Sequence, residues 1–387
     1  MSETTNPTTA GTTAETPAKA AVGAPPAGIA ARLRHPRPYL WVLGSVLLLA
    51  FPFYLDRFWL QAGLFAMAAA IGAIGLNLLT GATGQLSMGH AFFLAVGAYG
   101  YCVLAGESST ENGHDLTGLG LPSWLAAVLA VLLAGVAGGL FSPIAGRLRG
   151  AYLGIATLAL IFIGQHVLFN AGSLTGGFNG RAVPPLSLFG FDFDDTEVVV
   201  AAVPFQSSEK LWYAALLALL LSGLFARGVL RGRPGRALNA IRDHRIAAGV
   251  MGVPVARYRA AVFVLSSMYA GLAGVLLALV FQRTVPEYFG MVLSLEYLAM
   301  IVIGGLGTVA GAVVGAAFVS LLPQVLTHYS DSLPLVSAPG TGGLAPGEAS
   351  RYLYGAAVVA AVLFLPGGLT RLVPGGLTRL KNSGEKK

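Results

Sequence analysis

The sequence predicts an all-α integral membrane protein with about ten transmembrane helices, some of them broken or re-entrant. Two observations on composition and one on pattern predict this class. Hydrophobic residues make up 55% of the 387-residue chain and charged residues only 11%, whereas a soluble domain carries roughly 25% charged residues. Glycine is frequent, with 52 residues, as expected where helices pack backbone to backbone in lipid. Apolar runs long enough to cross a bilayer recur along most of the chain.

Residues 1–38 are expected to form a disordered cytoplasmic tail, because they are rich in Thr, Ala, Pro and Gly and show no apolar periodicity. Arg32, Arg34 and Arg37 precede the first apolar run, which begins near Tyr39, so no cleaved signal peptide is expected. Under the positive-inside rule this basic cluster places the amino end in the cytoplasm.

The transmembrane domain is expected over residues 39–372. A spanning helix needs about 20 apolar residues. Runs of that kind lie at 39–55, 58–81, 84–105, 121–145, 148–170, 211–230, 260–280 and 352–372. Between them we expect an external loop at 171–210 and a cytoplasmic loop at 233–259.

The apolar run 296–326 is too long for one crossing, and glycines interrupt it. We expect either two short crossings or a re-entrant half-helix followed by a full one, with the break buried in protein or lining a water-filled cavity. Counting a pair here gives ten crossings and puts the basic tail 373–387 on the cytoplasmic side. Most Lys and Arg residues of the whole chain then also lie on that side, as the positive-inside rule expects. Both termini are therefore expected in the cytoplasm of a multi-pass cell-membrane protein.

The loop 233–259 is the most polar stretch of the chain and is rich in arginine. Its pattern predicts one helix over Arg236–Met251 and a stop at Gly252. Leu238 and Ile241 lie on one apolar face of this helix, and Ile246 and Val250 partly continue that face. Two interpretations stand: a helix lying on anionic lipid, or a docking helix for a cytoplasmic protein. The small residues near its end favour docking, because a lipid-lying helix needs a broad apolar face.

Two interrupted segments contain the candidate translocation path. The first, GATGQLSMGH, lies between Leu79 and Ala91, and the second is the break in 296–326. The candidate path residues are Asn77, Gln85, Ser87, His90, Gly304, Gly305 and Gly307. The polar ones either cap a helix break or line the path. Paired interruptions in two halves of a transporter point to a transport site, although the two segments here are only loosely similar.

Ser173, Thr175 and Asn179 open the external loop and form either a turn at a helix end or a contact for a protein that delivers solute. Glu287 and Glu296 flank the later broken segment, where they make interfacial hydrogen bonds or gate the solute.

No motif in the sequence indicates an enzyme. The phosphate-binding pattern GxxxxGK[ST] does not occur, and neither does HExxH or GxSxG. We therefore expect no catalytic residue, no metal site and no cofactor on this chain, and any ATP hydrolysis belongs to another polypeptide. The single cysteine, Cys102, excludes an intrachain disulfide.

Four stretches resemble the permease subunits of branched-chain amino acid ABC importers, of the LivM type more than the LivH type. These are GLNLLTGATGQLSMGHAFFLAVGAYG (75–100), LRGAYLGIATLAL with SLTGGFNG (148–180), GRALNAIRDHRIAAGVMGVPVARYRAAVFVLSSMYAGLAGVL (235–276) and PEYFGMVLSLEYLAMIVIGGLGTVAGAVVGA (286–316). The resemblance spans about 75–372.

The resemblance implies the ABC importer permease fold and alternating access. It implies partners as well: a second, homologous permease in a heterodimer, two cytoplasmic ATPases that bind the ATP, an extracytoplasmic solute-binding protein and the lipid bilayer, with no nucleic acid. The arginine-rich loop resembles the coupling helix that sits in a groove of the ATPase. The expected coupling residues are Arg236, Arg242, Asp243, Arg245, Ala247, Ala248 and Gly252.

Two other transport functions stay open. The family commonly has a Glu and an Arg in the fifth crossing, where this chain has Phe162 and Gln165; the same machinery importing urea or short amides is therefore an alternative. A secondary transporter driven by an ion gradient is a more distant alternative. Such a transporter needs charged residues in mid-membrane, and away from the expected helix ends this sequence has none there.

Overall fold

The structure is a computed structural model that describes residues 48–111, 114–148, 150–188, 191–193, 198–200, 203–329, 345–364 and 369. The chain divides into two units, Met1–Leu48 and Leu49–Lys387. All the elements below belong to the second unit. The predicted tails 1–38 and 373–387, and most of the predicted crossing 39–55, lie outside the described residues.

The second unit is built from helices joined by short connections. The longer helices are α3 (Arg57–Thr83), α5 (Ser123–Arg147), α6 (Ala151–Asn170), α8 (Ser207–Arg231), α11 (Val255–Phe281), α13 (Val309–His328) and α14 (Pro346–Phe364). The shorter helices are η1 (Phe51–Phe53), α4 (His90–Ala105), α7 (Gly172–Thr175), η2 (Gly177–Asn179), α9 (Arg233–Asp243), α10 (Arg245–Val250), η3 (Pro286–Phe289) and α12 (Met291–Gly304).

Over the residues that the structure describes, six helices are long and apolar enough to cross a membrane: α3, α5, α6, α8, α11 and α13. The helices α4 and α12 are also apolar but shorter. The structure therefore confirms a mostly helical, multi-pass membrane protein.

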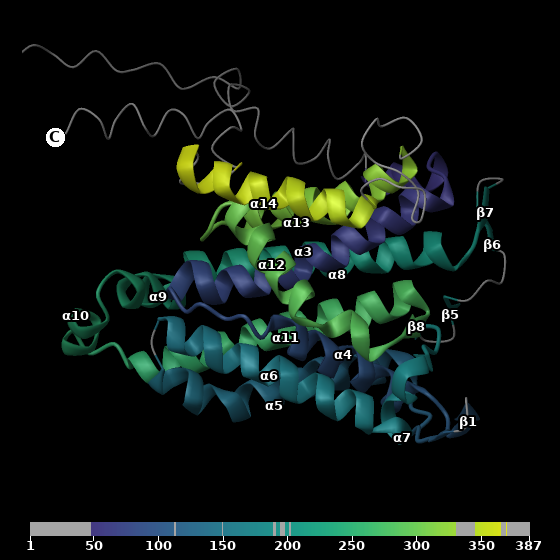
Figure 1. Cartoon of the computed structure of the whole chain (residues 1–387), viewed down its shortest axis with the longest axis horizontal. Coiled ribbons are helices and arrows are strands. Elements are labelled where there is room, and N and C mark those ends of the chain that lie inside the picture. Colours follow the sequence, from purple (N-terminus) through teal and green to yellow (C-terminus); the bar gives the residue numbers. More distant parts are fainter. Residues whose placement is uncertain are drawn as a thin grey trace, which may run out of the picture. The chain divides into compact units, whose positions relative to one another are not determined.

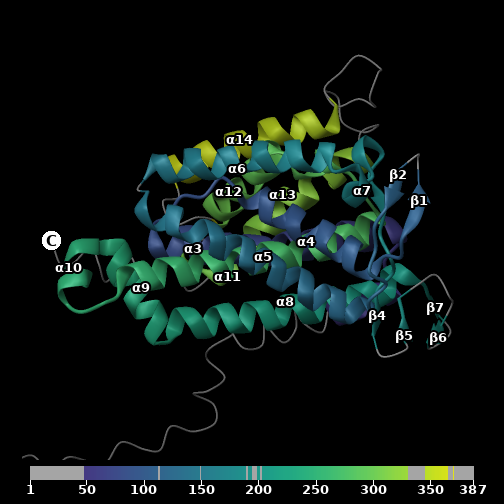
Figure 2. The same ribbon diagram turned by 90° about the horizontal axis from the view of Figure 1, so that it is seen from below.

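The strands are short and pair as antiparallel hairpins or ladders at one end of the helices, opposite α9 and α10 (Figures 1 and 2). The pairs are β1 (Ser109–Glu111) with β2 (His114–Leu116), β3 (Arg181–Ala182) with β8 (Arg283–Thr284), β4 (Ser187–Leu188) with β5 (Phe191–Asp192), and β6 (Val198–Val200) with β7 (Val203–Phe205). Arg181 lies opposite Thr284 in the β3–β8 pair, which ties the loop that follows α6 to the end of α11.

The core of the unit lies around α3 and α11. The helix α11 packs against α3, α4 and α5, and α3 also packs against α8 and α13. In their apolar windows, 83% of α3 and 78% of α11 is buried, whereas only 22% of α8 is. An apolar helix that is buried all round belongs to the interior, as α3 and α11 do. The helices α5, α6 and α8 are apolar but mostly unburied, so their outward faces are left for lipid or another subunit.

The predicted break in 296–326 is confirmed, because α12 ends at Gly304 and α13 begins at Val309, and the two helices pack against each other. Gly305 and Gly307 have φ of 114° and 81°, backbone that glycine adopts without strain. The helix predicted at 84–105 begins later, at His90. Gly84 ends α3 in the left-handed region with φ 69°, and residues 84–89 between α3 and α4 are not helical.

Candidate functional site

The arginine-rich loop lies at the end of the helices away from the strands and forms two helices, α9 and α10 (Figure 1). The predicted single helix Arg236–Met251 is wrong at His244, whose φ of −153° and ψ of 91° are extended. The reason is tertiary. Leu238 and Ile241 are buried and hold α9 against α3, α8 and α11. The main contacts of α10 are with α9 and α11 alone.

Arg242 connects this loop to the carboxyl-terminal turn of α3. Its Nη1 atom donates a hydrogen bond of 3.0 Å to the carbonyl oxygen of Gly81. Its Nε atom lies 3.3 Å from a carboxylate oxygen of Asp243. A charged donor to a carbonyl at a helix end stabilises both partners, because the last carbonyls of a helix carry partial negative charge. Arg242 therefore contacts the membrane helices rather than only the solvent.

Asn77, one turn before Gly81, connects α3 to the break between α12 and α13. Its Nδ2 atom donates to the carbonyl oxygen of Thr308 at 2.8 Å, and its Oδ1 atom accepts from the backbone N–H of Gly307 at 2.8 Å. A Cβ atom on Gly81 would overlap the backbone nitrogen of Gly307. Arg242, Gly81, Asn77 and Gly307 thus form one continuous contact series from the arginine-rich loop to the later break.

The earlier break, residues 84–89, packs against α6 at its later residues. The backbone N–H of Met88 donates to the hydroxyl of Thr157 at 2.9 Å, and a Cβ atom on Gly89 would overlap the Thr157 backbone. Gln85 and Ser87 are buried, and the Nε2 atom of Gln85 donates to the Thr83 hydroxyl at 3.0 Å. These contacts agree with polar caps on a helix break.

The helix α4 begins inside the bundle, beside α3 and α12. The backbone N–H of Ala91 donates to the Ser294 hydroxyl at 2.9 Å. The Nε2 atom of His90 lies 2.9 Å from the carbonyl oxygen of Gly72, and its ring centroid is 5.0 Å from that of Tyr297. The structure therefore places both breaks against α3 and α12. His90 lies at the earlier break, and Asn77 contacts the later one.

The exposed part of α10 is apolar, which the sequence analysis missed. Ile246, Val250 and Met251 are 77%, 84% and 85% exposed, whereas Ala248 is buried within the chain. We call these three exposed side chains the α10 patch. It borders a groove lined by Asp243, His244, Arg245, Ile246, Gly249, Val250 and Val255. The spacing of the patch at i, i+4 and i+5 could have indicated one exposed helix face, had the helix not been expected to continue from α9.

At the opposite end, the three residues predicted to contact a delivering protein separate. Thr175 is buried, and its hydroxyl donates to the carbonyl oxygen of Leu168 at 2.7 Å. Ser173 and Asn179 are exposed, beside Phe178, which is 81% exposed. Thr175 therefore stabilises the turn, and only the other two offer a surface.

Arg259, near the start of α11, is a buried arginine that the sequence prediction placed in the arginine-rich loop. Its guanidinium donates to the carbonyl oxygens of Gly146, Ala145 and Leu148, at 2.8, 3.1 and 3.1 Å. These carbonyls end α5, so the buried charge is satisfied by hydrogen bonds where the helix dipole is negative. Only the apolar residues that follow Arg259 could have indicated that it is buried.

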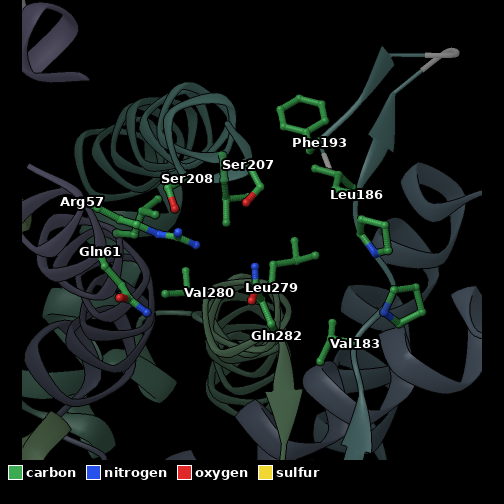
Figure 3. A pocket seen from close by; sticks show the side chains of 14 residues that line it. Arg57, Gln61, Val183, Leu186, Phe193, Ser207, Ser208, Leu279, Val280 and Gln282 are labelled. Carbon is green, nitrogen blue, oxygen red and sulfur yellow. The ribbon is translucent and has the colours of Figure 1, made fainter. Parts of the chain in front are cut away.

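Two cavities lie away from the arginine-rich loop. The first, of about 310 Å³, lies among the ends of α3, α8 and α11 and the loop that follows α6. Figure 3 shows Arg57 extending into this space between Ser208 and Val280, with Gln61 and Gln282 nearby. The second, of about 260 Å³, lies among α3, α11, α12 and α13.

The described residues contain no cluster of three or more His, Cys, Asp or Glu side chains that could hold a metal ion. Cys102 is buried. What the described residues do offer is a set of contacts between helices and the two cavities.

Comparison with known proteins gives consistent matches over this membrane region. The family described as "Branched-chain amino acid transport system / permease component" matches residues 60–362. The chain is 31% identical to the high-affinity branched-chain amino acid transport system permease protein LivM of Escherichia coli K12, over 74% of this chain and 68% of that protein. It is 26% identical to the corresponding LivH of Salmonella typhimurium, over 67% and 82%. It is 28% identical to the autoinducer 2 import system permease protein LsrC of Salmonella paratyphi B, over 74% and 77%. No solved structure matches the chain.

Proposed function

The chain belongs to the family of branched-chain amino acid transport system permease components, and on this premise we propose that it is the membrane permease subunit of an ATP-driven importer for branched-chain amino acids. ATP is bound by separate partner subunits. The observation that carries the proposal is the contact series from Arg242 through Gly81 and Asn77 to Gly307, because it connects a surface helix to a break inside the membrane domain.

The mechanism is alternating access, and this chain supplies the mechanical connection. Two ATPases dock on the coupling loops, one of them on the α10 patch of this chain. When they close on ATP they displace α10 and α9, and Arg242 passes that displacement to the end of α3. Asn77 then moves the break between α12 and α13. Coupling of this kind needs two sites joined by an element with two arrangements, and glycines at the break permit both.

The partner on the membrane side is a second, homologous permease. The chain is similar both to LivM and to LivH proteins, and the outward faces of α5, α6 and α8 provide apolar surface for a partner or for lipid. We propose ten crossings: the predicted first crossing 39–55, the six long apolar helices, the shorter α4 and α12, and α14. Both termini then lie in the cytoplasm. A solute-binding protein docks at the strand end, where Ser173 and Asn179 are exposed.

Urea or a short amide is the second candidate cargo. Phe162 and Gln165 stand where the family commonly has a Glu and an Arg, and Phe162 is exposed on α6. Competition of labelled leucine, urea and short amides for uptake, in cells with and without this chain, decides between them. Leucine uptake that depends on the chain supports the first candidate, and urea uptake that depends on it supports the second.

Docking on the α10 patch is tested by Ile246→Asp and Val250→Asp, each made in the complete importer. A carboxylate buried at the interface costs free energy because no partner is present to pair it. We expect the ATPase to dissociate from the purified complex and solute-stimulated ATP hydrolysis to fall about tenfold or more.

The conservative change Ile246→Leu is the matched control, since it keeps the apolar surface, and it should retain ATPase binding. Complexes with Asp at both positions that still co-purify the ATPase and hydrolyse ATP at the wild-type rate would rule out docking at this patch.

A further inference from the structure

The second cavity, which we call the Glu296 cavity, lies in the half of the membrane domain away from the arginine-rich loop. Its lining comes from four helices and from η3. The lining residues used below are Phe65 on α3, Phe281 on α11, Tyr288 on η3, Glu296 and Met300 on α12, and Ser320 and Gln324 on α13. At about 260 Å³ it is smaller than the roughly 300–1,000 Å³ of pockets that hold drug-sized ligands, so it suits a smaller molecule.

One wall of the cavity is aromatic. The ring centroids of Phe65 and Phe281 are 4.9 Å apart, and those of Phe281 and Tyr288 are 4.6 Å apart in a stacked arrangement. The three rings therefore form a continuous surface. Such a surface accepts an aliphatic side chain by burial of apolar area, and its ring faces also attract a positive charge.

The other walls carry polar groups at membrane depth. Glu296 is five residues beyond Met291, about 7.5 Å along α12 at 1.5 Å per residue. An acid within a membrane helix is costly, and it marks a solute or ion site by default. The Ser320 hydroxyl and the Gln324 carboxamide lie on α13 along the same cavity. The neighbouring Tyr297 is buried, and its hydroxyl has no hydrogen-bond partner in the described part of the chain.

We propose that the Glu296 cavity binds the transported solute during its passage: a small amino acid with an apolar side chain and a primary ammonium group. The ammonium group pairs with the Glu296 carboxylate, the side chain packs on the aromatic wall, and the solute carboxylate accepts hydrogen bonds from Ser320 and Gln324. The proposal rests on the proposed function and locates its cargo. A neutral urea or amide has neither a charge for Glu296 nor an apolar side chain for the rings.

The cavity also has a physical connection to the contact series. Its walls α12 and α13 are joined by the break that Asn77 holds, and Gly304 at that break is eight residues from Glu296, about 12 Å along α12. A displacement of the break therefore changes the spacing between Met300 on α12 and Val319 on α13, which both line the cavity. The cavity is positioned to release its solute when the loop moves.

The test uses the complete importer, with partner permease, ATPases and binding protein, reconstituted in proteoliposomes. The central variant is Glu296→Gln, which keeps the shape and removes the charge. The matched control is Glu287→Gln, an exposed acid on η3 that does not line the cavity. Met300→Trp, which fills the cavity without changing charge, is the second variant in case the first fails to assemble.

We expect Glu296→Gln and Met300→Trp each to lower labelled leucine uptake about tenfold or more, since a charge-assisted contact or the binding volume is lost. ATP hydrolysis stimulated by the loaded binding protein should persist in both, and Glu287→Gln should import normally. Wild-type uptake in both cavity variants overturns the cavity assignment alone. A wild-type complex that imports no branched-chain amino acid overturns the proposed function instead.

Discussion

Arg242 and Asn77 connect parts of the chain that are far apart in sequence. The Asn77 side chain bonds Thr308, 231 residues later, and Arg242 bonds Gly81, 161 residues earlier. Both bonds end on backbone atoms, at the end of α3 and at the α12–α13 break, where helix geometry leaves donors and acceptors unpaired. Arg242 thus pairs the Gly81 carbonyl near the end of α3, and Asn77 pairs the Gly307 N–H at the break, in addition to its bond to Thr308.

Arg242→Met should separate ATP hydrolysis from transport. The variant keeps the length of the side chain but loses the donor to Gly81, so the loop docks while its displacement no longer reaches α3. Coupling free energies of about 1–3 kcal/mol correspond to about 5- to 150-fold; we expect solute imported per ATP hydrolysed to fall about fivefold or more. The measurement is parallel uptake and phosphate release in proteoliposomes.

Arg245→Met is the matched control, because it removes the same charge from α10, and among the described residues Arg245 makes no hydrogen bond to a membrane helix. It should lower uptake and hydrolysis in proportion, if at all. Equal solute-to-ATP ratios in the two variants would show that the contact series does not transmit the movement.

The helices α12 and α13 pack backbone against backbone at glycines. A Cβ atom on Gly304 would overlap the carbonyl oxygen of Gly311, and one on Gly315 would overlap the carbonyl oxygen of Met300. Small residues at helix contacts allow this close approach in membranes, where van der Waals packing replaces the hydrophobic effect. The hairpin of α12 and α13 is therefore closely packed, and the short segment Gly305–Thr308 is enough to connect the two helices.

Gly315→Leu should destabilise the hairpin, because the new side chain must displace the backbone of α12. Overpacking of this kind costs about 1–3 kcal/mol or more. We expect a lower thermal-unfolding temperature of the purified complex in detergent, together with loss of uptake.

Gly228→Leu on α8 is the control for this change, since nothing lies within 4 Å of a Cβ atom there. It should unfold at the wild-type temperature. A Gly315→Leu complex as stable as this control would argue against close packing of α12 on α13.

On the scale of the whole membrane domain, the arginine-rich loop and the strands occupy opposite ends of the helices (Figure 1). Only α8 separates the loop that follows α6 from α9 along the chain. The proposed topology therefore puts the α10 patch in the cytoplasm and Phe178 outside. Transport requires this polarity, because the ATPases and the binding protein approach from different sides of the membrane.

Single cysteines test the polarity directly. Cys102 is buried and should react little with a membrane-impermeant maleimide. In permease without its ATPases, Met251→Cys should be labelled only in inside-out vesicles and Phe178→Cys only in right-side-out vesicles. Both positions are at least 81% exposed, so access is limited only by the membrane. Labelling of both from one side would refute the topology.

Much of the helical architecture could be predicted from the sequence, because apolar runs of bilayer length identify helices without any tertiary information. The runs 58–81 and 260–280 appear as α3 and α11, and glycines correctly indicated both breaks. His244 could not be predicted as a helix end, since nothing local stops the helix there; packing of Leu238 and Ile241 does. The burial of Arg259 and Thr175 could not be predicted either, because it depends on how other parts of the chain pack around these residues.

The sequence by itself determined the membrane class, the main helices and the family, because hydropathy, glycine placement and motif order are properties of the chain alone. Tertiary structure decided which of the candidate residues meet. It placed Asn77 on the α12–α13 break, turned Arg242 toward Gly81, buried Ala248 and exposed Ile246. The bonds of Asn77 and Arg242 join residues 231 and 161 positions apart, and only the packing of helices in three dimensions brings their atoms within hydrogen-bond distance.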